Sequence, residues 1–164
     1  MFAEVLLSLW EPSSSLMPFL RYNWRLSRAG QREAAVMGID FTLEKKPDYL
    51  LVTCRGRFAG EGLLDVHREA LDMAYRENLR AVLVDTTGLE KRAPTTMTRF
   101  GFGKAIAALQ QSHSRRISIA FVGAEPLIDP RRLGETAAVN RGGGVRVFES
   151  IEAAETWIRT LPAR

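Results

Sequence analysis

The chain has 164 residues, of which 46% are hydrophobic and 26% charged, and its formal net charge is +4. This length suits one domain whose core needs no disulfide support, and the composition argues against overall disorder. The arginine pairs Arg115-Arg116 and Arg131-Arg132 have no basic, aromatic-rich stripe around them. Nucleic-acid binding is therefore not expected.

Residues 1–36 differ from the rest of the chain. Their apolar run is short and follows an acidic residue, which fits a secretory signal poorly, and no stretch is long enough for a membrane span. One interpretation is an arm that contacts a membrane surface or a partner through Trp10, Phe19 and Trp24. The other, which we favour, is a loosely held extension or translated sequence before a start at Met37. We expect it to contribute no strand to a domain spanning residues 37–164.

Regular hydrophobic patterns begin at Met37. Residues 39–43 alternate between apolar and polar, Lys46-Pro47-Asp48 supplies a turn, and residues 49–55 form a second run, which predicts a β-hairpin. Apolar residues between 63 and 75 then fall on one face of a predicted helix.

Buried strands and helices alternate after this hairpin and helix. Residues 81–84 are continuously apolar, which is typical of a sheet covered on both faces. A second helix follows Pro94, with Thr95 or Thr96 as its cap. Residues 117–122 repeat the pattern of a buried strand.

The last third of the chain completes the predicted fold. Asp129-Pro130 is a helix start signal, and this third helix is expected to end near Asn140. Residues 145–148 form the last strand, and Ser150 caps a helix that stops before Pro162. The order β-β-α-β-α-β-α-β-α predicts an α/β fold with a mixed sheet, in which an antiparallel hairpin precedes parallel strands joined by crossover helices.

Polar residues follow the strand at 81–84, where ligands bind in open α/β sheets. Asp85-Thr86-Thr87-Gly88 matches the D-x-x-G of GTPases, but the sequence lacks their phosphate loop, and Thr87 replaces the second Asp of haloacid-dehalogenase-type phosphatases. Two interpretations remain: an anion site at a helix amino terminus, or a turn whose side chains satisfy backbone donors, which we favour. The candidate ligand- or partner-binding residues are Asp85, Thr86, Thr87, Gly88, Lys91, Arg92, Thr95 and Thr96.

The remaining reactive residue types are few. Cys54, the only cysteine, lies in an apolar run and is expected to be a buried thiol in a cytoplasmic protein. His67 lies on the inward helical face, and neither it nor His113 has an acidic residue at metal-ligand spacing. No catalytic set can be assembled from local motifs, although triads are spatial. We expect no metal site, no cofactor and no catalytic residue.

Four segments together resemble the SpoIIAA-like (STAS-type) family of bacterial proteins. They are the predicted hairpin, "AVLVDTTGL", "RISIAFVG" and "GVRVFESIEAAETWI", and the resemblance spans Met37 to about Leu161. It implies a mixed sheet with helices, as in anti-sigma-factor antagonists and, more loosely, the CRAL-TRIO lipid-transfer fold. Antagonists of this type carry an Asp-Ser pair, with a phosphorylatable Ser, at the start of the helix that follows the strand of Asp85. Here that stretch reads "RAPTTM", so Thr95 and Thr96 are expected to cap the helix rather than to act as a phosphate switch.

Three functions follow as hypotheses. The first is a non-enzymatic regulatory or protein-interaction module of the STAS type, for which a homodimer is left open. The second is a carrier or sensor of a small apolar or anionic ligand, whose mouth is formed by residues 86–96 with Phe100 and Phe102. The third is a hydrolase that uses His67. An inward pocket favours the second hypothesis, and a flat apolar patch favours the first.

Overall fold

The computed structural model describes residues 25–26, 31–90 and 92–162. Within these ranges, seven strands form one sheet in the order β1-β2-β3-β4-β5-β6-β7, with four helices. The elements are β1 (Arg25–Leu26), β2 (Arg32–Val36), β3 (Ile39–Lys45), β4 (Tyr49–Gly56), α1 (Gly60–Arg76), β5 (Ala81–Leu89), α2 (Thr96–Gln111), β6 (Ser118–Val122), α3 (Leu133–Val139), β7 (Val145–Phe148) and α4 (Ile151–Thr160).

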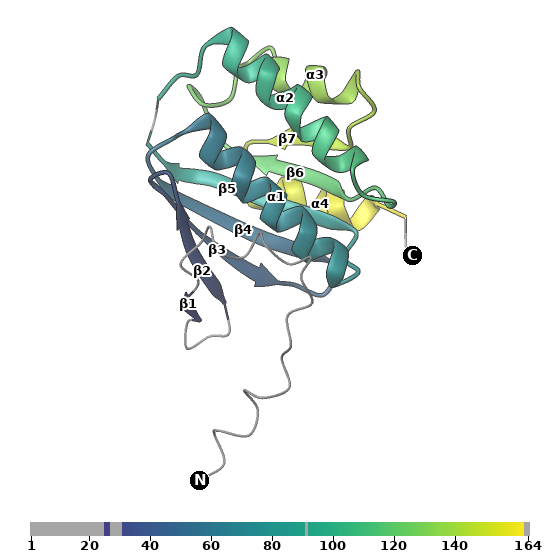
Figure 1. The fold of residues 1–164 in the computed structure, drawn as a ribbon. Coiled ribbons are helices and arrows are strands. Elements are labelled where there is room, and N and C mark those ends of the chain that lie inside the picture. The colour runs from purple at the N-terminus through teal and green to yellow at the C-terminus, as the bar shows by residue number, and fades with distance from the viewer. Residues whose placement is uncertain (1–24, 27–30, 91, 163–164) are drawn as a thin grey trace.

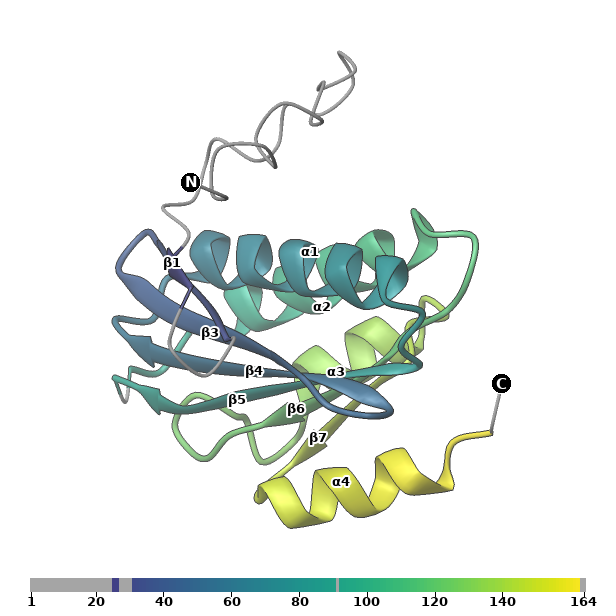
Figure 2. The ribbon, with the colours of Figure 1, turned by 90° about the horizontal axis from the view of Figure 1, so that it is seen from below.

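The sheet is mixed, as predicted. Strands β1 to β4 pair antiparallel, and β4 to β7 pair parallel. Because the strands follow one another in chain order, crossovers of one hand place their connecting helices on one face of the sheet. Helices α1, α2 and α3 cover that face, and α4 covers the other (Figures 1 and 2). The predicted α/β fold and the order of its elements from residue 39 onward are confirmed.

The end of the predicted extension forms a strand, so the expectation that it contributes none is wrong. Strand β2 pairs with β3, and its Ala34 is buried in the core. Met37 and Gly38, with φ values of 48° and 84°, form a two-residue hairpin turn between the two strands. The other residues of β2 are exposed or half-buried, so its sequence carries a weak pattern. The proposed membrane or partner contacts of Trp10, Phe19 and Trp24 lie outside the described residues.

The core has two parts because the sheet is covered on both faces. Alternate residues of β5 and β6 point to opposite sides, which explains why these strands are continuously apolar. Val82 and Ile119 belong to the larger cluster on the side of α1. Leu83 and Ala120 pack in a smaller cluster with Ile158 of α4.

The third helix begins later than predicted, at Leu133 rather than at Asp129-Pro130. Asp129 accepts a hydrogen bond from the backbone N–H of Arg131 at 2.7 Å, and Arg132 then takes a left-handed conformation with φ 51°. A local turn therefore competes successfully with the helix at this start signal. The result is an irregular segment between β6 and α3.

Candidate functional site

The predicted polar site lies within a strand rather than after one. Strand β5 continues to Leu89, so the prediction that it ends at Val84 is wrong. Thr53 pairs with Asp85, and Arg55 pairs with Gly88, so one residue of β4 faces two of β5. This is a β-bulge, which re-aims side chains locally while the strand continues.

Bonds within the protein occupy the polar groups of this bulge. Asp85 is buried, and its Oδ1 accepts from the backbone N–H of Thr87 at 2.9 Å and from the Thr87 hydroxyl at 2.7 Å. The Thr86 hydroxyl donates to the carbonyl of Val122 at 2.8 Å. A Cβ at Gly88 would lie 2.8 Å from the carbonyl oxygen of Cys54, so the bulge needs a glycine there. Asp85 thus accepts from a backbone donor, as the favoured interpretation predicts, but in a bulge within β5 rather than in a turn. Ligand binding by these residues stays a prediction.

Of the remaining candidate residues, those that the structure describes lie outside this bulge. Lys91 lies outside the described residues, and Arg92 is exposed. The Thr95 hydroxyl accepts from the backbone N–H of Thr98 at 3.1 Å, which makes Thr95 the cap of α2. Thr96 is exposed as the first helical residue.

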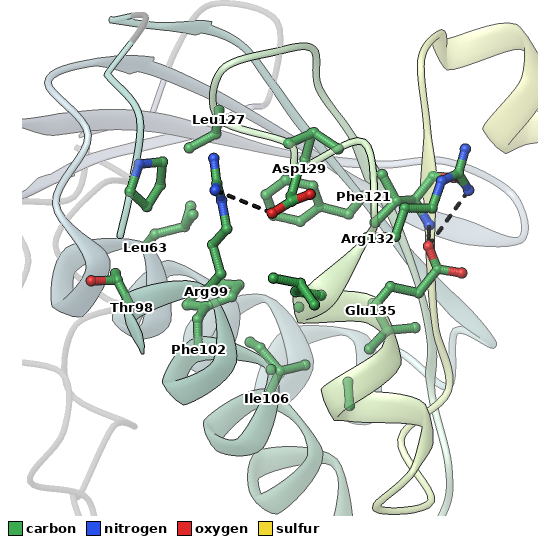
Figure 3. A pocket seen from close by; sticks show the side chains of 18 of the residues that line it. Leu63, Thr98, Arg99, Phe102, Ile106, Phe121, Leu127, Asp129, Arg132 and Glu135 are labelled. Atoms are coloured by element: carbon green, nitrogen blue, oxygen red, sulfur yellow. Dashed lines mark hydrogen bonds and ion pairs between the residues drawn. The ribbon is translucent and has the colours of Figure 1, made fainter. Parts of the chain in front are cut away.

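A cavity lies elsewhere, between β6 and β7 on one side and α2, α3 and the segment before α3 on the other (Figure 3). Its free volume is about 80 Å³, and one side opens to solvent. This is several times the volume of about 10–15 Å³ that a single water molecule needs. Its apolar lining includes Leu63, Phe102, Ile106, Phe121, Leu127 and Val147.

The predicted mouth of a ligand site matches this cavity only in part. Phe102 and Pro94 line it. Phe100 instead is 40% exposed and lies under the guanidinium of Arg141, 5.0 Å from the ring centre. The two phenylalanines are two positions apart on α2, so they point to different sides of the helix.

Two ion pairs border the cavity, as Figure 3 shows. Arg99 of α2 lies 3.3 Å from Asp129, and it also donates to the carbonyl of Pro126 at 2.6 Å. Arg132 lies 3.5 Å from Glu135 at the start of α3. Hydrogen bonding by the Arg131 N–H, helped by nearby arginines, holds the pKa of Asp129 below its usual range. The two cations and two carboxylates of the lining therefore balance.

His67 and Asp129 are the buried polar residues of the lining. His67 Nδ1 lies 2.7 Å from the carbonyl oxygen of Leu63, and His67 Nε2 has no hydrogen-bond partner. Burial lowers the pKa of His67 to about 4, against the weaker opposing effect of the Leu63 bond, so the ring is neutral at pH 7. The ring stacks on Phe121 at 5.8 Å and meets the edge of Phe102 at 5.3 Å. Arg99 Nε is also buried without a partner.

The other reactive side chains, those of His113 and Cys54, are paired with or buried by neighbouring residues. His113 Nε2 lies 2.9 Å from Asp72, a pairing across 41 positions of the chain that local spacing could not reveal. Cys54 is buried, as predicted, and burial raises its pKa to about 12. Among the described residues, no group of three His, Cys, Asp or Glu side chains could hold a metal ion. In the same part of the chain, every helix is too short or too polar to cross a membrane.

The fold has a counterpart of known structure. No protein-family model and no curated protein matches the sequence. The chain is similar to the crystal structure of an anti-sigma factor antagonist from Mycobacterium paratuberculosis, with a TM-score of 0.51 and 15% sequence identity. The match covers 76% of this chain and 97% of that chain. The chain thus has the SpoIIAA-like (STAS) fold of an anti-sigma factor antagonist, as its sequence motifs predicted.

Proposed function

We propose that this chain is a cytoplasmic, non-enzymatic regulatory module that binds a small, mainly apolar molecule in the cavity between the sheet and helices α2 and α3. The observation that carries this proposal is the cavity of about 80 Å³ with an apolar lining and one open side. Packed protein interiors contain few voids larger than one water molecule. A mainly apolar cavity with a few convergent polar groups is typical of a ligand site.

The surroundings of His67 favour binding over hydrolysis. A catalytic histidine usually takes its orientation from a carboxylate, whereas His67 Nδ1 bonds to the main-chain carbonyl of Leu63. A base with a pKa of about 4 is also a weak proton acceptor at neutral pH. These two features support a non-catalytic role for this histidine.

Toluene tests the proposal, because it fits an apolar cavity and carries no polar group. Full-length protein is titrated with toluene by NMR, beside two variants, Leu127→Trp and Met97→Trp. Leu127 lines the cavity on the segment before α3, whereas Met97 is 76% exposed at the start of α2. We expect saturable binding to the wild type and to Met97→Trp, and none to Leu127→Trp. Absence of binding to the wild type, or equal binding to all three, contradicts the proposal.

A second candidate function, binding of a protein partner, is favoured by the exposed start of α2. Met97 and Phe100 are 76% and 40% exposed, and Arg92, Thr95 and Thr96 neighbour them in the sequence. The structural counterpart is named as an antagonist of another protein. The full chain is isolated from its native cells with and without Met97→Glu, and bound proteins, including a second copy of this chain, are quantified by mass spectrometry. A partner that Met97→Glu releases supports this function, and the lack of any such partner contradicts it.

A further inference from the structure

The hydrogen-bonding state of His67 follows from its one polar contact. The carbonyl oxygen of Leu63, 2.7 Å from Nδ1, can only accept a hydrogen bond. Nδ1 must therefore carry the proton. In the neutral ring, Nε2 is then a bare acceptor, and it is buried without a partner.

A buried acceptor without a partner lowers the stability of the protein, since its bonds to water are lost and not replaced. Nε2 lies across the ring from the bond to Leu63, so it faces away from the backbone of α1. The ring contacts Phe102 and Phe121, which line the same cavity. His67 itself lines the cavity, so a donor group that enters beside the ring would give this nitrogen the partner that it lacks.

The charges of the lining restrict the ligand further. Arg99 and Arg132 are each paired with a carboxylate, Asp129 and Glu135 respectively. An anionic ligand would lie near these carboxylates as well as near the arginines, and a cationic ligand would lie near the arginines as well as near the carboxylates. Neither charge is favoured in a cavity whose own charges balance.

We propose that the cavity selects a neutral molecule with an apolar body of about the size of a benzene ring and one hydrogen-bond donor, a hydroxyl or an N–H, directed at His67 Nε2. This inference rests on the proposed function, and it replaces the choice between apolar and anionic ligands with one chemical class. His67 acts as the acceptor that determines specificity.

Three molecules of similar size test it at pH 7.5: phenol, toluene and benzoate. Dissociation constants are measured by NMR titration or calorimetry for the full-length wild type and for His67→Phe, which keeps an aromatic ring and removes the acceptor. We expect the preference for phenol over toluene to fall about tenfold or more in His67→Phe, the size expected for a buried hydrogen bond. Benzoate is expected to bind more weakly than phenol to the wild type. His113→Phe, whose histidine lies outside the lining, is the matched control and keeps the wild-type preference.

The outcomes separate this inference from the proposed function. If toluene binds the wild type but the phenol preference is the same in His67→Phe, or if benzoate binds more tightly than phenol, the donor class is wrong while the cavity remains a ligand site. If none of the three binds the wild type, both are wrong. Should His67→Phe fail to fold, the ¹⁵N resonance of His67 Nε2 in the wild type tests the same hydrogen bond. It is expected to shift with phenol and not with toluene, and an equal response to both overturns the inference.

Discussion

The bulge at Asp85 and the cavity beside His67 are opposite arrangements of polar groups. In the bulge, polar residues are adjacent in sequence, and Asp85, Thr86 and Thr87 find hydrogen-bond partners within the protein. In the mainly apolar lining of the cavity, His67 and Arg99 each have a buried nitrogen without a partner. A cluster of polar residues in the sequence is thus a poor indicator of a ligand site when local hydrogen bonds can satisfy their polar groups. An unsatisfied buried atom is the stronger indicator.

The largest expected effect is the loss of folding stability when His67, beside the cavity, is protonated. His67 has a pKa of about 4 in the folded protein and 6.5 as its ordinary value, so protons bind the unfolded chain more readily. Stability contributed by the neutral ring is complete above pH 6.5 and is lost as the pH falls toward 4. The wild type should therefore lose roughly 3 kcal/mol more than His67→Phe across this window. Urea denaturation of both proteins at several pH values measures the difference, and parallel curves would contradict it.

Truncation tests whether both regions belong to a domain that starts near residue 37. A chain that begins at residue 37 should still unfold cooperatively and bind toluene, because β3 to β7 and the helices remain. It should be less stable by roughly 2 kcal/mol than a chain that begins at residue 31, since it lacks the β2 ladder and buried Ala34. Thermal melts compare the two chains. Loss of cooperativity in the shorter one would show that β2 is indispensable to the domain.

Asp85→Asn tests the bulge as a structural feature. The amide oxygen of Asn still accepts from Thr87, but the charge is lost, so the free energy of unfolding should fall on the order of 1 kcal/mol. Toluene binding should not change, because Asp85 does not line the cavity. Chemical denaturation and the NMR titration measure the two quantities. Unchanged stability together with a lost ligand or partner would assign Asp85 to a binding site instead.

The smallest effect concerns the threonines at the start of α2. Thr95→Ala removes the cap and should cost about 1 kcal/mol, whereas Thr96→Ala, at an exposed position, should stay within about 0.5 kcal/mol of the wild type. Denaturant melts of the two variants form a matched pair. Phosphopeptide mapping adds an independent check: stoichiometric phosphate on Thr95 or Thr96 in native cells would show a role beyond capping.

Local sequence patterns predicted most of the elements, and their failures have physical causes. Some features depend on only a few neighbouring residues, so the sequence shows them directly. They are the helix caps, predicted at Thr95 or Thr96 and at Ser150, and the apolar runs predicted as strands at 81–84 and 117–122. Strand β2 escaped prediction because it lies near the edge of the sheet and buries only Ala34. The continuation of β5 past Val84 escaped because β4 provides its bulged pairing.

The sequence by itself determined the order of the elements from residue 39, the α/β class, the two-sided burial of the sheet and the buried state of Cys54, because periodicity and composition act locally. Only the tertiary structure decided which polar groups are satisfied. The cavity joins residues from α1, α2, β6, α3 and β7, and the ion pair of Arg99 with Asp129 spans 30 positions. A hydrogen-bond partner is a matter of proximity in space, and no local pattern reveals that His67 Nε2 lacks one.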